Sequence, residues 1–293
     1  MIKGIISKIL NKLDLKVNAA SKKSDINLYL KIHGRKAIDE KRFYNVGQAS
    51  FFHPAWTIID FFKKQDGTVV LPGDFAIHHD LMSLQPLPVE SSSAELIYTS
   101  HTLEHVTNQA VSFFLKEAYR MLKPGGIIRI TTPDIKLTYR AWRDGDTDFF
   151  FWVPNSYPDG NWHEFNLKIP LREATLTQVF LEDFASTASE ITDIGAEQRI
   201  SDEEMYRIFS SMKMEDALDY CINRCPVELQ QRFPYHHMNW FTEEKMGSML
   251  NNAGFQEVYS SRWGQSRSAV MRNTDYFDTN TPRLSMYMEA VKQ

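Results

Sequence analysis

Histidine and glutamate side chains gather in one short segment, Ser100-His101-Thr102-Leu103-Glu104-His105. Histidine ordinarily titrates near neutral pH, so this segment is suited to accepting or releasing a proton during a reaction. Histidine and glutamate also bind divalent metals, and spacings of three and four residues place His101, Glu104 and His105 on one face of a helical turn. Because the sequence shows no further ligand, we assign no metal. The alternative is structural: Glu104 or His105 hydrogen-bonds the loop backbone while Leu103 fills the core.

The elements around this segment predict a β–α–β unit. An apolar strand at 96–99 leads into it, and a second strand at 127–131 follows a helix and a Gly-rich turn. The helix is predicted by apolar residues three and four positions apart, namely Val111, Phe114, Leu115, Ala118, Tyr119 and Leu122. Ligands bind beyond the carboxyl ends of parallel strands, so we expect Ser100–His105 and Pro133-Asp134 to face a ligand.

Two short strands earlier in the chain carry a pattern typical of nucleoside binding. The first, 43–46, ends in Gly47-Gln48-Ala49, and the second, 56–59, ends in Asp60. Glycine lets the backbone approach a ligand, and a carboxylate after the next strand accepts hydrogen bonds from ribose hydroxyls. With only one glycine the pattern is weak, and the alternative is a tight turn between a strand and a helix.

Length and composition describe an ordinary soluble globular protein of 293 residues, 43% of them hydrophobic. A formal net charge of -4 gives no reason to expect a nucleic-acid partner. No apolar run approaches the roughly 18 residues that span a bilayer, and lysines interrupt the region where a signal peptide would lie. We therefore expect a cytoplasmic location. The two cysteines, Cys221 and Cys225, are interpreted as reduced thiols.

Residues 1–41 are locally basic and predict a helical arm. One face of its first helix is apolar and the lysines lie opposite; the apolar residues are Ile2, Ile5, Ile6, Ile9, Leu10 and Leu13. We expect this helix to pack on the domain. The alternative is peripheral contact with an anionic membrane surface or with a partner. The sequence does not indicate an oligomeric state.

Taken in order, these pieces resemble the class I S-adenosylmethionine-dependent methyltransferases, in particular a small-molecule group with S-H-x-L-E-H and L-K-P-G-G blocks. The matching segments are Asp80-Leu81, Leu87-Pro88, Ser93 to His105, Glu117 to Gly126, Trp240 to Phe255 and Ser285 to Lys292. The resemblance implies an α/β fold with a doubly wound, Rossmann-like, mostly parallel sheet. It also implies S-adenosylmethionine as the cofactor.

The resemblance further implies cofactor-binding residues at the ends of the first four strands: Gly47, Gln48, Ala49, Asp60, Asp80, Leu81 and Ser100. Asp60 would accept from the ribose hydroxyls, and Asp80 with the Leu81 backbone would meet the adenine. An oxygen acceptor needs a base with a pKa near neutral, which favours histidine. The candidate catalytic residues are, in order of preference, His101, His105 and His236.

Residues 135–235 interrupt the family pattern and predict an aromatic, partly helical insertion between the fifth strand and the late helix. Such a segment could supply the acceptor pocket above the strand ends; the alternative is a satellite hydrophobic cluster. We therefore divide the chain into three parts. These are the basic N-terminal arm (1–41), a methyltransferase-like Rossmann domain (42–134 and 236–293) and an inserted cap (135–235).

The predicted function is S-adenosylmethionine-dependent methylation of a small molecule, with a sugar or glycan hydroxyl as the preferred acceptor. The alternative is a non-catalytic protein of the same fold that binds a ligand or a protein partner. Ala49, in the position of a second glycine, motivates that alternative. A dehydrogenase is disfavoured because the chain contains no Gly-x-Gly-x-x-Gly pattern.

Overall fold

The computed structural model describes residues 25–47, 51–62, 68–151, 173–192 and 197–293. The amphipathic helix predicted within residues 2–13 lies outside these ranges, and so do Gln48 and Ala49. Within the described ranges, no helix has both the length and the apolar character needed to cross a bilayer.

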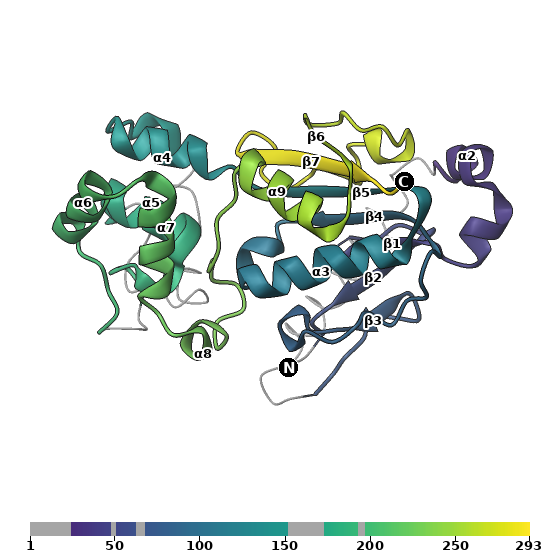
Figure 1. The fold of residues 1–293 in the computed structure, drawn as a ribbon, viewed down its shortest axis with the longest axis horizontal. Coiled ribbons are helices and arrows are strands. Elements are labelled where there is room, and N and C mark those ends of the chain that lie inside the picture. The colour runs from purple at the N-terminus through teal and green to yellow at the C-terminus, as the bar shows by residue number, and fades with distance from the viewer. Residues whose placement is uncertain (1–24, 48–50, 63–67, 152–172, 193–196) are drawn as a thin grey trace, which may run out of the picture.

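A seven-stranded sheet with the order β3-β2-β1-β4-β5-β7-β6 forms the centre of the protein (Figure 1). Its strands are β1 (Phe43–Val46), β2 (Trp56–Asp60), β3 (Ala76–His78), β4 (Ala94–Ser100), β5 (Leu122–Pro133), β6 (Glu257–Ser261) and β7 (Ser285–Val291). The first five strands are parallel, and β7 runs antiparallel to both of its neighbours. The prediction of a doubly wound, mostly parallel sheet is confirmed.

Helices cover one face of the sheet and mixed structure covers the other. Helix α3 (Asn108–Met121) and helix α9 (Glu243–Ala253) lie side by side on the first face and share an apolar cluster with β4 and β5 (Figure 1). Helix α2 (Ile26–Asp39) packs on the opposite face through Tyr29, together with Phe277 from the loop between β6 and β7. Three layers thus hold the strand ends in fixed relative positions.

Helix α3 shows how the sequence specifies these layers. The Thr107 hydroxyl accepts the backbone N–H of Ala110 and caps the first turn. The predicted apolar stripe is buried, apart from Tyr119, which is half-buried. The helix ends at Met121, before Leu122, the last residue of the predicted apolar stripe, because Leu122 already takes extended angles and begins β5.

Between β5 and α9, the described residues form a helical unit with its own apolar cluster (Figure 1). Its helices are α4 (Ile135–Arg143), α5 (Leu176–Ala185), α6 (Asp202–Ser211), α7 (Met214–Asn223) and α8 (Val227–Gln230). Trp142 stacks on Phe180 at the centre, with ring centroids 5.2 Å apart. Cys221 and Cys225 are both buried in this cluster as free thiols, and burial raises the pKa of each. Because α4 follows β5 directly, the unit lies at the carboxyl ends of the parallel strands.

Candidate functional site

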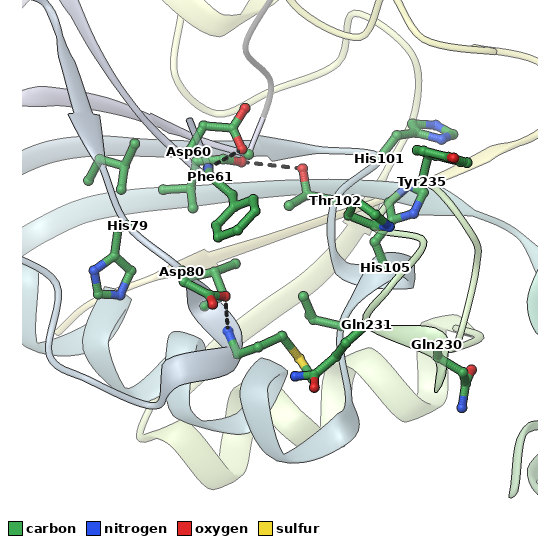
Figure 2. A pocket seen from close by; sticks show the side chains of 17 residues that line it. Asp60, Phe61, His79, Asp80, His101, Thr102, His105, Gln230, Gln231 and Tyr235 are labelled. Atoms are coloured by element: carbon green, nitrogen blue, oxygen red, sulfur yellow. Dashed lines mark hydrogen bonds between the residues drawn. The ribbon is translucent and has the colours of Figure 1, made fainter. Parts of the chain in front are cut away.

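A cavity of about 630 Å³ opens at the carboxyl ends of β1, β2, β3 and β4 (Figure 2). It lies where the strand order reverses, between β1 and β4, which is the usual ligand position in a doubly wound sheet. Four strand ends and one segment of the insertion line it, with Val46, Gly47, Ile59, Asp60, Phe61, His79, Asp80, Leu81, Met82, His101, Thr102, His105, Val106, Gln230, Gln231, Pro234 and Tyr235.

Gly47 closes β1 in a conformation that suits glycine. Its φ is +91°, in the left-handed region, and its N–H donates to the Ile59 carbonyl at 2.8 Å. A Cβ at this position would collide with the side chain of Thr102 from the loop after β4. The single glycine of the sequence pattern therefore lets two strand-end loops approach each other closely.

Asp60 and Asp80 both line the cavity, each after a parallel strand (Figure 2). The Asp60 carboxylate accepts the N–H of Phe61 at 2.7 Å, and its backbone carbonyl accepts the N–H of His79 at 2.9 Å. The Asp80 carboxylate accepts the N–H of Met82 at 2.9 Å and so caps a short 3₁₀ helix. These bonds fix the loops and hold both carboxylates at the cavity wall.

Ser100 does not line the cavity. Its side chain is buried in the sheet, where its Oγ accepts a hydrogen bond from Thr131 Oγ1 at 2.8 Å. Thr102, two residues later, does line the cavity, and its hydroxyl donates to the Ser100 carbonyl at 3.2 Å. Cofactor binding by Ser100 remains a prediction, and the buried position of its side chain does not support it.

His101 turns the chain sharply at the end of β4, with φ at +49°, an unusual value for a side chain of its size. Its Nε2 lies 2.7 Å from Ser285 Oγ, and Ser285 in turn donates to the Thr281 carbonyl. Its Nδ1 lies 3.2 Å from Glu104 Oε1. His101 therefore lines the cavity with both ring nitrogens already close to protein groups.

His105 and His236 differ in their access to the cavity. His105 lines it and is half-buried, and its Nδ1 lies 3.2 Å from the backbone carbonyl of His236. Burial and the neighbouring His237 together lower the pKa of His105 to about 4. The side chain of His236 is buried instead beside Thr187 and Phe233, outside the cavity wall.

Glu104 occupies the middle of this group and is 1% exposed. Burial alone would raise the pKa of its carboxyl, but the imidazoles of His101, His105 and His237 outweigh it and lower the pKa well below the usual range. The half-buried His237 shows the converse effect. Burial would lower its pKa, and the carboxylates of Glu104, Glu182 and Asp183 raise it.

Several lining residues were not predicted from the sequence, among them His79, Gln230, Gln231 and Tyr235. They come from a loop and an insertion whose paths the sequence does not specify. Thr102 belongs to the segment Ser100–His105 that the strand-end rule predicted to face a ligand, and it lines the cavity. Conversely, Asp134 does not face the cavity, contrary to the prediction. Its carboxylate caps α4 through the N–H of Lys136 at 3.0 Å.

The chain thus has a Rossmann-like, doubly wound sheet with a cavity at the usual ligand position of such a fold. Residues 59–130, about a quarter of the chain, match the family model described as "Methyltransferase domain". A probable S-adenosylmethionine-dependent methyltransferase of Mycolicibacterium smegmatis is 32% identical over 62 residues, which are 21% of this chain and 23% of that relative. The family model places the similarity to methyltransferase domains in the β2 to β5 region. The alignment spans less than a quarter of the relative's length.

Solved structures of methyltransferases also resemble the chain at low similarity. An S-adenosylmethionine-dependent methyltransferase of Thermotoga maritima is 10% identical with a TM-score of 0.36, covering 92% of this chain and 95% of that one. A phosphoethanolamine N-methyltransferase of Haemonchus contortus, solved with S-adenosyl-L-methionine, is 9% identical with a TM-score of 0.35. That match covers 89% of this chain and 52% of the other.

Proposed function

We propose that this protein is an S-adenosylmethionine-dependent methyltransferase that acts on a small-molecule acceptor. The observation that carries the proposal is the strand-end cavity, with the Gly47 turn on one wall and the carboxylates of Asp60 and Asp80 on the next two loops. Its volume of about 630 Å³ falls within the range of about 300–1,000 Å³ that accommodates small-molecule ligands. The match to the methyltransferase domain supports the same function.

In the proposed binding mode the cofactor follows the strand ends in order. Its methionine part lies against Gly47 and Thr102, the ribose hydroxyls donate to Asp60, and the adenine lies near Asp80 and Leu81. The sulfonium methyl group then points toward the loop after β4. The acceptor enters from the side of the cavity that Gln230 to Tyr235 cover.

Methyl transfer is an in-line displacement. The acceptor atom forms a bond to the methyl carbon while the carbon–sulfur bond breaks and S-adenosylhomocysteine leaves, so catalysis consists largely of positioning. For a hydroxyl acceptor we assign the base to His101, with Glu104 beside it to stabilise the imidazolium. His101 Nε2 would have to exchange its contact with Ser285 for the acceptor hydroxyl. His105 is the second choice.

We favour a sugar or glycan hydroxyl as the acceptor. The amide of Gln231 and the phenol of Tyr235 give the acceptor side of the cavity hydrogen-bonding groups (Figure 2). The Gln230 amide is buried and donates to the Cys225 carbonyl instead. Sugars require such groups because each hydroxyl that leaves water must find a new partner.

Titration calorimetry with S-adenosylmethionine and S-adenosylhomocysteine tests the proposal directly. We expect saturable binding of both ligands at one site per chain. Asp60→Ala should weaken binding about 10- to 100-fold, the effect of losing hydrogen bonds to a charged group. His101→Ala should leave cofactor affinity unchanged and slow the transfer once an acceptor is found. If the wild-type protein binds neither ligand, the proposal of a methyltransferase is wrong, and the alternative of a non-catalytic protein of the same fold is favoured.

A further inference from the structure

One group of side chains beside the cavity, one of them buried and two half-buried, is not needed to bind the cofactor. Glu104, His105 and His237 each offer a ligand atom, and these three atoms lie within 4.8 Å of one another. Glu104 and His105 come from the 3₁₀ turn after β4, and His237 comes from the segment that leads out of the insertion. The fold itself therefore brings a carboxylate and two imidazoles together.

The Glu104 carboxylate lacks the hydrogen bonds that a buried carboxylate normally has. Within the described part of the chain, neither of its oxygens has a hydrogen-bond partner, although the residue is 1% exposed. His101 Nδ1 is 3.2 Å from Oε1, but this contact does not have hydrogen-bond geometry. A buried carboxylate without hydrogen bonds is costly unless a cation compensates it.

Each of the two histidines has its Nδ1 close to a backbone carbonyl, a contact that metal-binding histidines commonly make. Nδ1 of His105 is 3.2 Å from the backbone carbonyl of His236, and Nδ1 of His237 is 2.6 Å from the backbone carbonyl of Asp183. A carbonyl only accepts hydrogen bonds, so Nδ1 must carry the proton in each ring. Nε2 of the neutral ring then keeps its lone pair for a ligand, as in metal sites whose histidines donate their other N–H to a carbonyl.

We propose that Glu104, His105 and His237 bind a divalent transition-metal ion next to the acceptor side of the cavity. Two imidazole nitrogens and one carboxylate oxygen suit zinc and its first-row neighbours, and three protein ligands leave a coordination position open. Ligand atoms around such an ion are about 3.3 Å apart, so the observed group must contract by about an ångström and a half at most to bind it. Magnesium, which prefers oxygen ligands, should bind poorly.

His105 lines the cavity, so an ion bound by this residue would lie beside the space assigned to the acceptor. There the ion would orient an acceptor hydroxyl and lower its pKa. That role rests on the proposed methyl transfer, whereas binding of the ion does not. The His101 ring beside Glu104 would then take up the proton that the hydroxyl releases.

Cobalt and zinc titrations of the full chain, purified without a histidine tag and treated with a chelator, test the site. We expect one Co²⁺ per chain, with visible absorption bands of nitrogen and oxygen coordination, displaced by Zn²⁺ and not by Mg²⁺. Glu104→Gln and His237→Gln should each weaken cobalt binding at least about tenfold. Loss of a residue that only supports a metal ligand already lowers metal affinity by about that factor, and these variants remove a ligand itself. His79→Gln is the matched control, a histidine that lines the same cavity outside the cluster.

S-adenosylhomocysteine affinity, measured on the same variants, shows that each is folded. Retained S-adenosylhomocysteine binding with lost cobalt binding supports the metal site. Absence of cobalt and zinc binding in the wild-type protein overturns it, and so does binding that both variants retain at wild-type strength. If the wild-type protein binds the metal but not S-adenosylhomocysteine, the proposed function is wrong and the proposed metal site is still supported.

Discussion

At the scale of single residues, the site depends on Gly47 more than its isolated position in the sequence indicates. The left-handed φ of +91° and the contact with Thr102 both disfavour a side chain there. The sequence pattern identified the glycine but attributed it to ligand approach. The structure adds a second reason, since two loops of the cavity wall meet at this point.

Gly47→Ala should therefore lower both stability and cofactor affinity. A residue with a Cβ is strained at this φ, and the collision with Thr102 must displace the loop after β4, so we expect a loss of more than about 1 kcal/mol in unfolding free energy. Urea unfolding and S-adenosylhomocysteine calorimetry measure the two effects. Gly125→Ala is the matched control, because its φ is +78° and no atom lies within 4 Å of the added Cβ. Equal losses in both variants would contradict the role of the Thr102 contact.

At the scale of elements, buried charge fixes the antiparallel edge of the sheet. Arg129 of β5 is fully buried and binds Asp278 at 2.5 Å and Glu289 of β7 at 2.8 Å. It also donates to Ser261 Oγ at the end of β6. One guanidinium thus joins three strands and the loop between β6 and β7.

Arg129→Met should destabilise the protein by about 3–5 kcal/mol, because it leaves the carboxylates of Asp278 and Glu289 buried without their cation. Lys136→Met is the control and removes an exposed ion pair with Glu244, 2.6 Å long, for which less than about 1 kcal/mol is expected. Urea unfolding at pH 7 compares them. Similar losses in the two variants would show that burial does not determine the contribution of the pair.

Helix α9 contains a lysine whose pKa is lowered, Lys245. Burial lowers the pKa of Lys245 to about 8, although Asp219 acts in the opposite direction. Its ammonium donates to the Trp240 carbonyl at 2.9 Å and lies 3.8 Å from the centroid of the Trp240 ring. In the unfolded chain the ordinary pKa of 10.5 applies.

Between pH 8 and 10.5 the unfolded state therefore binds more protons at Lys245 than the folded state, and this group makes stability rise with pH. The gain between pH 8 and 9.5 should be about 1.5 kcal/mol relative to Lys245→Met, which has no titrating amine. Unfolding free energies of both proteins across this range give the difference. A difference that does not change with pH would show that the folded pKa is not lowered.

At the scale of the whole molecule, the cavity joins two parts that have separate apolar clusters. Strand-end loops of the sheet form most of its wall, and Gln230 to Tyr235 of the insertion form the rest. A ligand in the cavity contacts both parts. The division into a Rossmann domain and an inserted cap remains a prediction. A first test is whether S-adenosylhomocysteine changes hydrogen exchange in both parts.

S-adenosylhomocysteine should slow amide hydrogen exchange in the loops after β1 and β2 and also in residues 230–235. At a ligand concentration of 100 times the dissociation constant, binding stabilises the folded protein by about 2.7 kcal/mol. Amide protons that exchange only when the site opens should therefore exchange more slowly. Strand β6, at the sheet edge opposite β3, is the internal control and should change little. Protection of the strand-end loops without any change at 230–235 would place the insertion outside the cofactor site.

The sequence by itself determined the doubly wound sheet, the positions of α3 and most strands, and the polar segment after β4. These features follow from local patterns: apolar periodicity, capping residues, and the rule that parallel strands present their carboxyl ends to a ligand. The same rule placed Gly47, Asp60, Asp80 and His101 at one edge, and all four line the cavity.

Tertiary structure alone decided which side chains face one another across that edge. It turned Ser100 into the sheet, used Asp134 as a helix cap and buried His236 outside the cavity. It also brought His237 to Glu104 and His105, which completes the group that we propose as a metal site. The path of a long insertion depends on packing between distant segments, and side-chain direction at a strand end depends on the exact turn. Neither is set by local residue pattern.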